Sequence, residues 1–139
     1  MSQTTDVIYT ARTRTAGGRD HGVARSADGQ LDVAFAPPGS KRIGTNPEQM
    51  FAAGWSACFE GAIGLAALRK RIKLPADVAI DAEIDLHLDD GAYFLSARLD
   101  ISIPGVERNV AQDLVDAAET ICPYSKAIAG NVAVTYRVV

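Results

Sequence analysis

Alternating apolar and polar residues predict a long β-hairpin in the second half of the chain. Successive side chains of a strand point to opposite faces, so a period of two gives each strand one apolar face. This alternation flanks the turn sequence at residues 89–91, through Val78, Ile80, Ala82, Ile84, Leu86 and Leu88 before it and Tyr93, Leu95, Ala97, Leu99, Ile101 and Ile103 after it. The same alternation over residues 132–138 predicts a closing strand.

The opening third of the chain has the pattern of a β-meander. Residues 7–14 are rich in β-branched and aromatic side chains, and apolar residues alternate with smaller or charged ones over 31–35. Both segments are predicted to be strands. Residues 17–22 read as a turn-rich loop between them, and the pair Asp28 and Gly29 supplies a second turn.

A change to helical spacing predicts a long helix that begins at Asn46. Asn46 suits the N-cap, and Pro47 suits the first helical position because its missing N–H has no partner there anyway. Glu48 lies near the positive end of the helix dipole, and Gln49 takes the capping-box position. Apolar residues then follow at helical spacing: Phe51, Trp55, Cys58, Ala62 and Leu65.

The predicted helix ends in the basic run 69–71, before Pro75. Gly54, Gly61 and Gly64 each lower its intrinsic helicity by about 1 kcal/mol relative to alanine. So many small residues indicate close packing against another backbone. We therefore expect a buried central helix, as at a subunit interface.

A second helix is predicted before Pro123. Its apolar stripe is Val110, Leu114, Ala117, Ala118 and Ile121, and it must stop near Cys122 because of the following proline. Pro123 can open a short helix to Ala129, which Gly130 ends. The predicted fold class is α+β, with antiparallel sheets, a long buried central helix and a second helix.

Length and composition favour an ordinary globular protein. We expect residues 1–139 to form one domain, since the chain is too short for two typical domains. A formal net charge of -3 argues against nucleic acid as a partner. The N-terminus has no basic segment followed by an apolar core, and Glu60 interrupts the most apolar later stretch. The expected location is the cytoplasm, without membrane binding.

Two cysteines in different settings suggest thiol chemistry. Cys58 lies in the long apolar helix and Cys122 directly precedes a proline, so they are either small core residues or a reactive pair. A reactive thiol needs a device that favours the thiolate. A cation about 4 Å away contributes on the order of 4 kcal/mol at an effective dielectric of about 20. Arg19, next to two glycines, is the candidate, the alternative being a solvated loop arginine.

Three sequence blocks resemble a known family. Residues 17–20 (Gly-Gly-Arg-Asp), residues 44–59 and the Cys-Pro-Tyr-Ser block at 122–125, with Gly-Asn at 130–131, resemble the Ohr branch of the Ohr/OsmC peroxidases, the organic hydroperoxide resistance proteins. The resemblance spans the whole chain and implies an intertwined homodimer. Trp55 stands where tyrosine is usual in this family.

The resemblance also implies roles for four residues. Cys58 would attack the peroxide and become a sulfenic acid, and Cys122 would resolve it as an intramolecular disulfide. Arg19 would activate Cys58, and Glu48 would orient Arg19. Glu48 and Cys58 are ten positions apart, or about 15 Å along a straight helix. Either the helix breaks at Gly54 or the site is completed across a dimer, which we favour.

The expected activity is reduction of organic hydroperoxides, including fatty-acid hydroperoxides, without a cofactor. The family implies a lipoyl dithiol as reductant. Candidate walls of an apolar substrate pocket are Phe51, Trp55, Phe59 and Ile128. His21 and His87 are far apart in the sequence and no metal is predicted. Two alternatives remain, namely an OsmC-type peroxidase of broader peroxide scope and a non-catalytic oxidant-sensing or ligand-binding dimer.

Overall fold

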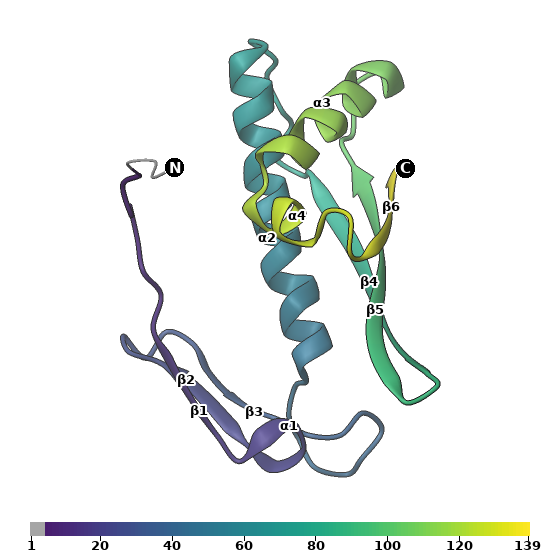
Figure 1. Ribbon diagram of the computed structural model, residues 1–139. Helices are drawn as coiled ribbons and strands as arrows, with labels where there is room; N and C mark the ends of the chain where they lie inside the picture. Colours follow the sequence, from purple (N-terminus) through teal and green to yellow (C-terminus); the bar gives the residue numbers. More distant parts are fainter. Residues whose placement is uncertain (1–4) are drawn as a thin grey trace. The chain divides into compact units, whose positions relative to one another are not determined.

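The computed structural model describes residues 5–139 and divides into two compact units (Figure 1). One unit ends at Pro47 and the other spans Glu48–Val139. Each unit contains a three-stranded sheet. The helices and strands together form the mixed α+β architecture expected from the sequence. The expectation of a single domain stays a prediction.

The sheet of the N-terminal unit is the predicted meander. Strands β1 (Thr13–Ala16), β2 (Val23–Ser26) and β3 (Asp32–Ala34) pair antiparallel in the order β1-β2-β3. Strand β2 was not identified from the sequence. The segment predicted to be a loop contains one helical turn, α1 (Gly18–His21). Two glycines with positive φ, Gly17 and Gly18, allow the chain to enter this turn.

The first predicted strand is shorter than expected. Among the described residues, the segment 7–12 belongs to no strand, although its side chains favour one. Val7, Ile8 and Tyr9 are 78%, 97% and 76% exposed. A strand forms only where a neighbour accepts its backbone hydrogen bonds, and β2 offers such a neighbour from Thr13 onward.

Helix α2 (Pro47–Arg69) begins where the sequence predicts and runs without a break. The helix ends where Arg71 adopts a left-handed conformation, with φ of 57°. The N–H groups of Arg71 and Ile72 donate to the carbonyls of Leu68 and Ala67, at 3.2 and 2.9 Å. These are the two bonds of a Schellman motif, which pairs carbonyls that the helix end leaves open.

The second unit contains the long hairpin, formed by β4 (Ala79–Asp89) and β5 (Ala92–Ser102). Asp90 and Gly91 turn the chain, both with positive φ, as a two-residue hairpin turn of type I′ requires. Helices α3 (Arg108–Ile121) and α4 (Pro123–Ile128) follow, and β6 (Ala133–Val138) closes the chain. All of these elements lie at or near their predicted positions.

One pairing differs from the predicted antiparallel sheets. Strand β6 runs parallel to β5, from the pair Ser96 and Ala133 to the pair Ile101 and Val138. The reason is the connection between them. Helices α3 and α4 carry the chain back along the sheet, and such a crossover returns the next strand in the same direction. The second sheet is therefore mixed.

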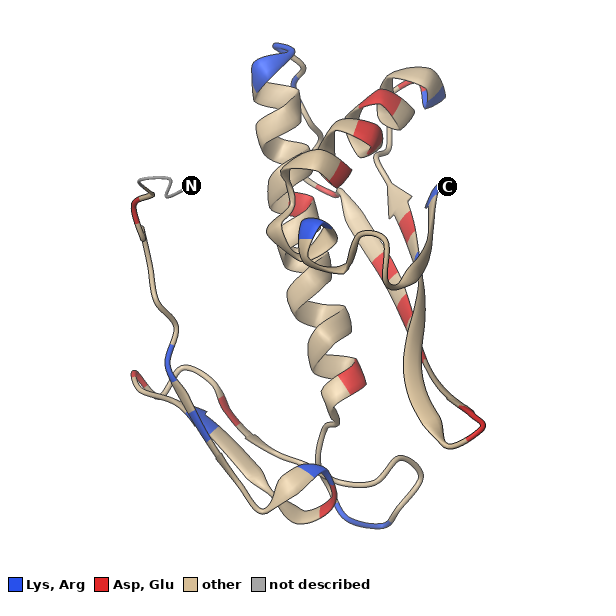
Figure 2. Ribbon diagram, viewed as in Figure 1, with Lys and Arg blue, Asp and Glu red and all other residues tan. Residues whose placement is uncertain are grey.

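The core of the second unit lies between one face of this sheet and the helices α2 and α3. Its largest fully buried side chains are Trp55, Phe59, Ile63, Leu99, Ile101, Leu114, Val115 and Cys122. Burial of an apolar side chain of this size contributes roughly 1.5–3 kcal/mol. Figure 2 shows that α2 is nearly bare of charge between its ends, as a core helix requires. By length and composition alone α2 could also cross a membrane, a test that core helices of soluble proteins pass as well.

Candidate active site

The two cysteines of the chain meet inside the second unit. The Cys122 thiol donates a hydrogen bond to Cys58 Sγ at 3.4 Å, and both cysteines are free thiols. Cys58 is partly buried on α2, whereas Cys122 has no exposed surface. A disulfide would need the sulfurs to approach by about 1.4 Å. Small movements of side chains can supply an approach of this size.

Cys122 is fixed from both sides by its place between two helices. Its N–H donates to the carbonyl of Ala118 at 2.8 Å and so closes α3. Its own carbonyl accepts from the N–H of Lys126 at 3.0 Å and so opens α4. Pro123 disfavours a helical conformation at Cys122, which has φ of -64° and ψ of 119°. The sequence Cys-Pro therefore makes a sharp corner that carries the thiol.

The surroundings of Cys58 do not activate it on their own. Burial raises the pKa of the Cys58 thiol, and a hydrogen bond from the backbone N–H of Tyr124 opposes this shift in part. Within Glu48–Val139, no cation is among the groups that shift this pKa. A thiol with a raised pKa is mostly protonated at neutral pH, so rapid attack on a substrate needs a further positive charge.

Arg19 and Glu48, the predicted activating pair, lie in different units. Arg19 is in the helical turn α1, and Arg42 donates to the carbonyls of His21 and Phe35 at 3.1 and 2.8 Å. Arg42 thus ties the turn that carries Arg19 to the end of β3. Glu48 lies in the first turn of α2. The roles of both residues stay predictions.

A break at Gly54, one of the two ways proposed to bring Glu48 and Cys58 to one arginine, is wrong. Helix α2 is continuous across this glycine. A Cβ added at Gly54 would lie 2.9 Å from the hydroxyl oxygen of Tyr124. The glycine therefore makes room for the Tyr124 side chain, which is close packing against a ring rather than the predicted packing against a backbone.

Aromatic rings stack on one another in the core cluster that also contains the two cysteines. Phe51 stacks on Trp55 and on Tyr124, with centroids 5.4 and 6.2 Å apart. Tyr136 stacks on Phe59 at 5.2 Å and meets Trp55 edge-on at 6.2 Å. The thiol pair thus belongs to a largely apolar cluster.

The four predicted pocket residues differ in their exposure. Trp55 and Phe59 have no exposed surface, while Phe51 and Ile128 are partly buried. In this conformation a ligand would reach Trp55 or Phe59 only after neighbouring side chains move. The role of the four residues as pocket walls stays a prediction.

Ser125 was missed as a site residue. It is 4% exposed and accepts two hydrogen bonds, from Trp55 Nε1 and from the Tyr136 hydroxyl, both at 3.0 Å. The sequence contains one clue, because Ser125 follows Cys122 by three positions and can therefore lie on the same face of a helical turn. Nothing in the sequence pointed to its partners, which are 70 and 11 positions away.

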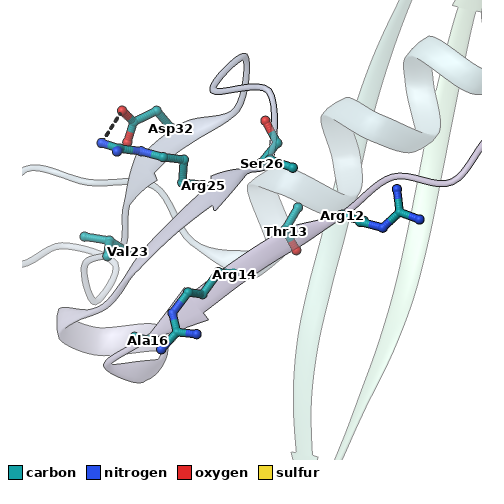
Figure 3. A pocket seen from close by; sticks show the side chains of 9 residues that line it. Arg12, Thr13, Arg14, Ala16, Val23, Arg25, Ser26 and Asp32 are labelled. Carbon is teal, nitrogen blue, oxygen red and sulfur yellow. Dashed lines mark hydrogen bonds and ion pairs between the residues drawn. The ribbon is translucent and has the colours of Figure 1, made fainter.

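A cavity of about 610 Å³ lies in the N-terminal unit, whereas both thiols belong to the other unit. Arg12, Arg14 and Arg25 line it together with small and polar residues. Figure 3 shows that these arginines do not converge, and Arg25 is turned to Asp32 at 3.0 Å. The Ser26 hydroxyl in its lining donates to Asp28 at 2.6 Å and accepts from the N–H of Leu31 at 2.9 Å, so it is engaged in ordering the turn after β2. The paired thiols are therefore the better candidate site.

His87 is held by structural contacts rather than arranged as a metal ligand. Its Nε2 lies 2.7 Å from the hydroxyl of Ser96, and its ring stacks on Phe94 at 4.6 Å. His21 lies in α1 of the other unit. Over residues 5–139 no three histidine, cysteine or acidic side chains gather in a way that could hold a metal ion.

Comparison with known proteins gives consistent matches. Residues 38–137 match the family described as OsmC-like protein. The organic hydroperoxide resistance protein of Xanthomonas axonopodis pv. citri is 41% identical over 139 residues, covering 97% of each chain. OhrB of Bacillus subtilis, also an organic hydroperoxide resistance protein, is 41% identical over 130 residues, covering 90% of this chain and 93% of the relative.

Solved structures agree with these sequence matches. The crystal structure of Bacillus subtilis OhrB has a TM-score of 0.89 at 38% identity and covers 96% of this chain and 100% of that one. A related protein from Vibrio cholerae, with captopril bound in one of its active sites, has a TM-score of 0.89 at 31% identity, covering 98% and 95%. This chain therefore belongs to the OsmC-like family, in the branch of the organic hydroperoxide resistance proteins.

Proposed function

We propose that this chain is a cysteine-based peroxidase that reduces organic hydroperoxides to alcohols. The observation that carries the proposal is the 3.4 Å contact between Cys58 Sγ and Cys122 Sγ, in a chain whose relatives are named for organic hydroperoxide resistance. Two thiols this close can form a disulfide without a change of fold.

The reaction has two steps. The Cys58 thiolate attacks the terminal peroxide oxygen, the O–O bond breaks, and the alkoxide takes a proton to leave as the alcohol. Cys58 is then a sulfenic acid. The Cys122 sulfur attacks the Cys58 sulfur, an S–S bond forms, the S–O bond breaks, and hydroxide leaves as water with the Cys122 proton. The exposure of the two thiols supports this order, because Cys58 is the accessible one.

A dithiol returns the disulfide to two thiols, and we propose a lipoyl-type dithiol from the family resemblance. Exchange requires a thiolate to reach a disulfide sulfur. Cys58 is partly exposed and Cys122 is buried, so attack is expected at Cys58. We also propose that the chain acts in a reducing compartment such as the cytoplasm, where thiols are kept reduced.

We further propose that the active unit is a homodimer in which Arg19 and Glu48 complete the site of the other protomer. The continuous helix α2 keeps Glu48 about 15 Å along its axis from Cys58 of its own chain. An arginine oriented by Glu48 is therefore more easily shared with the thiol of a partner. Arg19 would supply the positive charge that the second unit lacks beside Cys58.

Exposed apolar surface in the second unit supports the dimer. Apolar side chains on α2 and on the far half of the hairpin remain exposed: Leu65, Leu68, Leu86, Leu88 and Tyr93. Beside Gly61 and Gly64, open space surrounds the position of an added Cβ. Large exposed apolar patches mark interfaces in soluble proteins.

Peroxide turnover with dihydrolipoamide tests the proposal. Wild type should reduce tert-butyl hydroperoxide much faster than hydrogen peroxide, and Cys58→Ser should abolish turnover. Cys122→Ser should permit one oxidation and then stall. Comparable rates with the two peroxides would favour the OsmC-type alternative, and a stoichiometric oxidation without turnover would favour the sensor. Equal single-turnover rates in wild type and Cys58→Ser would rule out the assignment of Cys58.

A further inference from the structure

We infer that Trp55, Ser125 and Tyr136 form a positioning clamp, a set of buried hydrogen bonds that holds Cys122 against Cys58. The inference deepens the proposed function and rests on it only in that the two cysteines react with each other. None of the three residues needs to touch the peroxide. Their role is to hold Cys122 Sγ within reach of Cys58 Sγ.

The spacing along the chain places the hydrogen bond between Trp55 and Ser125 next to the thiol pair. Trp55 lies three residues before Cys58 on α2, and Ser125 lies three residues after Cys122. Residues three apart on a helix share a face. The bond from Trp55 Nε1 to Ser125 Oγ, at 3.0 Å, therefore joins the same two segments as the contact between the sulfurs, one turn away.

Tyr136 supplies a third point of attachment, from the sheet. Its hydroxyl donates to Ser125 Oγ at 3.0 Å, and its ring stacks on Phe59 and meets Trp55 edge-on. Two donors from two different elements thus converge on one serine oxygen. A hydroxyl oxygen can accept both bonds through its two lone pairs. With two fixed donors, α4 can neither slide along α2 nor turn about its own axis without breaking a buried hydrogen bond.

The burial of α4 shows why such a clamp is needed. Of its six described residues, Ser125 is the one that is buried. A helix this short is not stable by itself. A hydrogen bond between two thiols is weak and holds little. The segment that carries Cys122 is therefore anchored by the polar side chain of Ser125. Loss of these hydrogen bonds leaves the Cys122 thiol freer to move.

The equilibrium between the thiol pair and its disulfide tests the clamp without any peroxide. The full-length protein is equilibrated in dithiothreitol redox buffers, and the effective concentration of Cys122 at Cys58 is measured. Ser125→Ala should lower it roughly tenfold, because both donors lose their acceptor. Tyr136→Phe removes one donor, keeps the stacked ring, and should lower it by a smaller factor. If Ser125→Ala does not fold, Tyr136→Phe decides.

Val115→Ala is the matched control. Val115 is fully buried on α3 and belongs to the same core, but not to the clamp. The substitution should lower the melting temperature and leave the effective concentration of Cys122 at Cys58 unchanged. An unchanged or raised effective concentration in both clamp variants would overturn the inference, as would an equal fall in Val115→Ala.

Over-oxidation gives a second measurement, and it separates the two proposals. In excess tert-butyl hydroperoxide, Ser125→Ala should carry more sulfinic acid on Cys58 than wild type, because slower resolution exposes the sulfenic acid to a second peroxide. Wild type that is not oxidised at all would refute the peroxidase, while the dithiothreitol equilibrium would still decide on the clamp. Normal peroxide oxidation with equal sulfinic acid in both proteins would refute the clamp alone.

Discussion

The two largest local effects on the pKa of Cys58 oppose each other. Burial raises the pKa of its thiol, and the backbone N–H of Tyr124 lowers it in part. The balance favours the protonated form, which is a poor nucleophile. Within Glu48–Val139, none of the groups that shift this pKa is a cation. Arg19 is the candidate cation.

Replacement of Arg19 by alanine should raise the pH at which Cys58 is alkylated by about 1 unit or more, since a cation beside a thiolate lowers its pKa. Peroxide reduction should slow steeply, because less thiolate is present at neutral pH. Iodoacetamide labelling across a pH series measures the first effect. Arg12→Ala, which removes another exposed arginine of the same unit, should leave the midpoint unchanged. An unmoved midpoint in Arg19→Ala would return Arg19 to the role of a solvated loop residue.

Tyr136 makes the stability of the protein sensitive to alkaline pH. Burial raises the pKa of its hydroxyl, while the hydrogen bond with Ser125 opposes the shift. The folded state therefore keeps this proton to higher pH than the unfolded state. Its contribution to stability is complete below the ordinary value, about 10, and is lost as pH rises through the raised one.

The fall of the melting temperature at alkaline pH should thus be steeper in wild type than in Tyr136→Phe. Thermal unfolding followed between about pH 8 and 11 measures this difference, over a range that brackets the ordinary tyrosine value. Tyr93→Phe, at an exposed tyrosine near the hairpin turn, should keep the wild-type slope. Identical slopes in all three proteins would show that Tyr136 does not titrate in this range.

At the scale of elements, the sequence predicts what local patterns determine. The hairpin, α2 and the corner at Cys122 follow from alternation, capping residues and a proline, all within a few positions. The parallel pairing of β6 and the missing strand at 7–12 depend on which segments become neighbours, and alternation is the same for either choice. The anchoring of Ser125 by Trp55 depends on a contact across 70 positions, which no local pattern contains.

Gly54 links the packing of α2 to the position of α4. A glycine-to-alanine change inside a helix normally stabilises it by about 1 kcal/mol. At this position the new methyl group would lie 2.9 Å from the Tyr124 hydroxyl oxygen, so the ring must move and the gain should be lost. The backbone N–H of Tyr124 also donates a hydrogen bond to Cys58. A shift of Tyr124 should therefore change the reactivity of the thiol.

A double-mutant cycle of Gly54→Ala with Tyr124→Phe tests this explanation. Removal of the hydroxyl leaves the next ring atom at 3.4 Å, a distance that small shifts can accommodate. The double variant should be more stable than expected from the sum of the single changes, as measured by denaturant unfolding. Additive changes in the free energy of unfolding would mean that the two residues do not conflict.

At the scale of the whole molecule, the residues of the proposed site are divided between the two units. The thiol pair lies within one protomer, in Glu48–Val139. Arg19 belongs to the other unit, and the continuous α2 separates Glu48 from its own Cys58. Exposed leucines on α2 and on the hairpin offer surface for a second copy. These features together favour sites that are shared between protomers.

Subunit mixing gives a direct test of shared sites. Arg19→Ala and Cys58→Ser are each expected to be nearly inactive. If Arg19 serves the partner's thiol, a heterodimer of the two holds one intact site and one that lacks both groups. Random exchange of equal amounts should then restore about a quarter of the wild-type activity, because half the dimers are mixed and each has one working site of two.

The matched control mixes Cys58→Ser with Cys122→Ser. These two thiols meet within one protomer, so no combination restores an intact pair and activity should stay low. Recovery in the control, or none in the first mixture when native mass spectrometry shows that heterodimers have formed, would contradict sharing of the site.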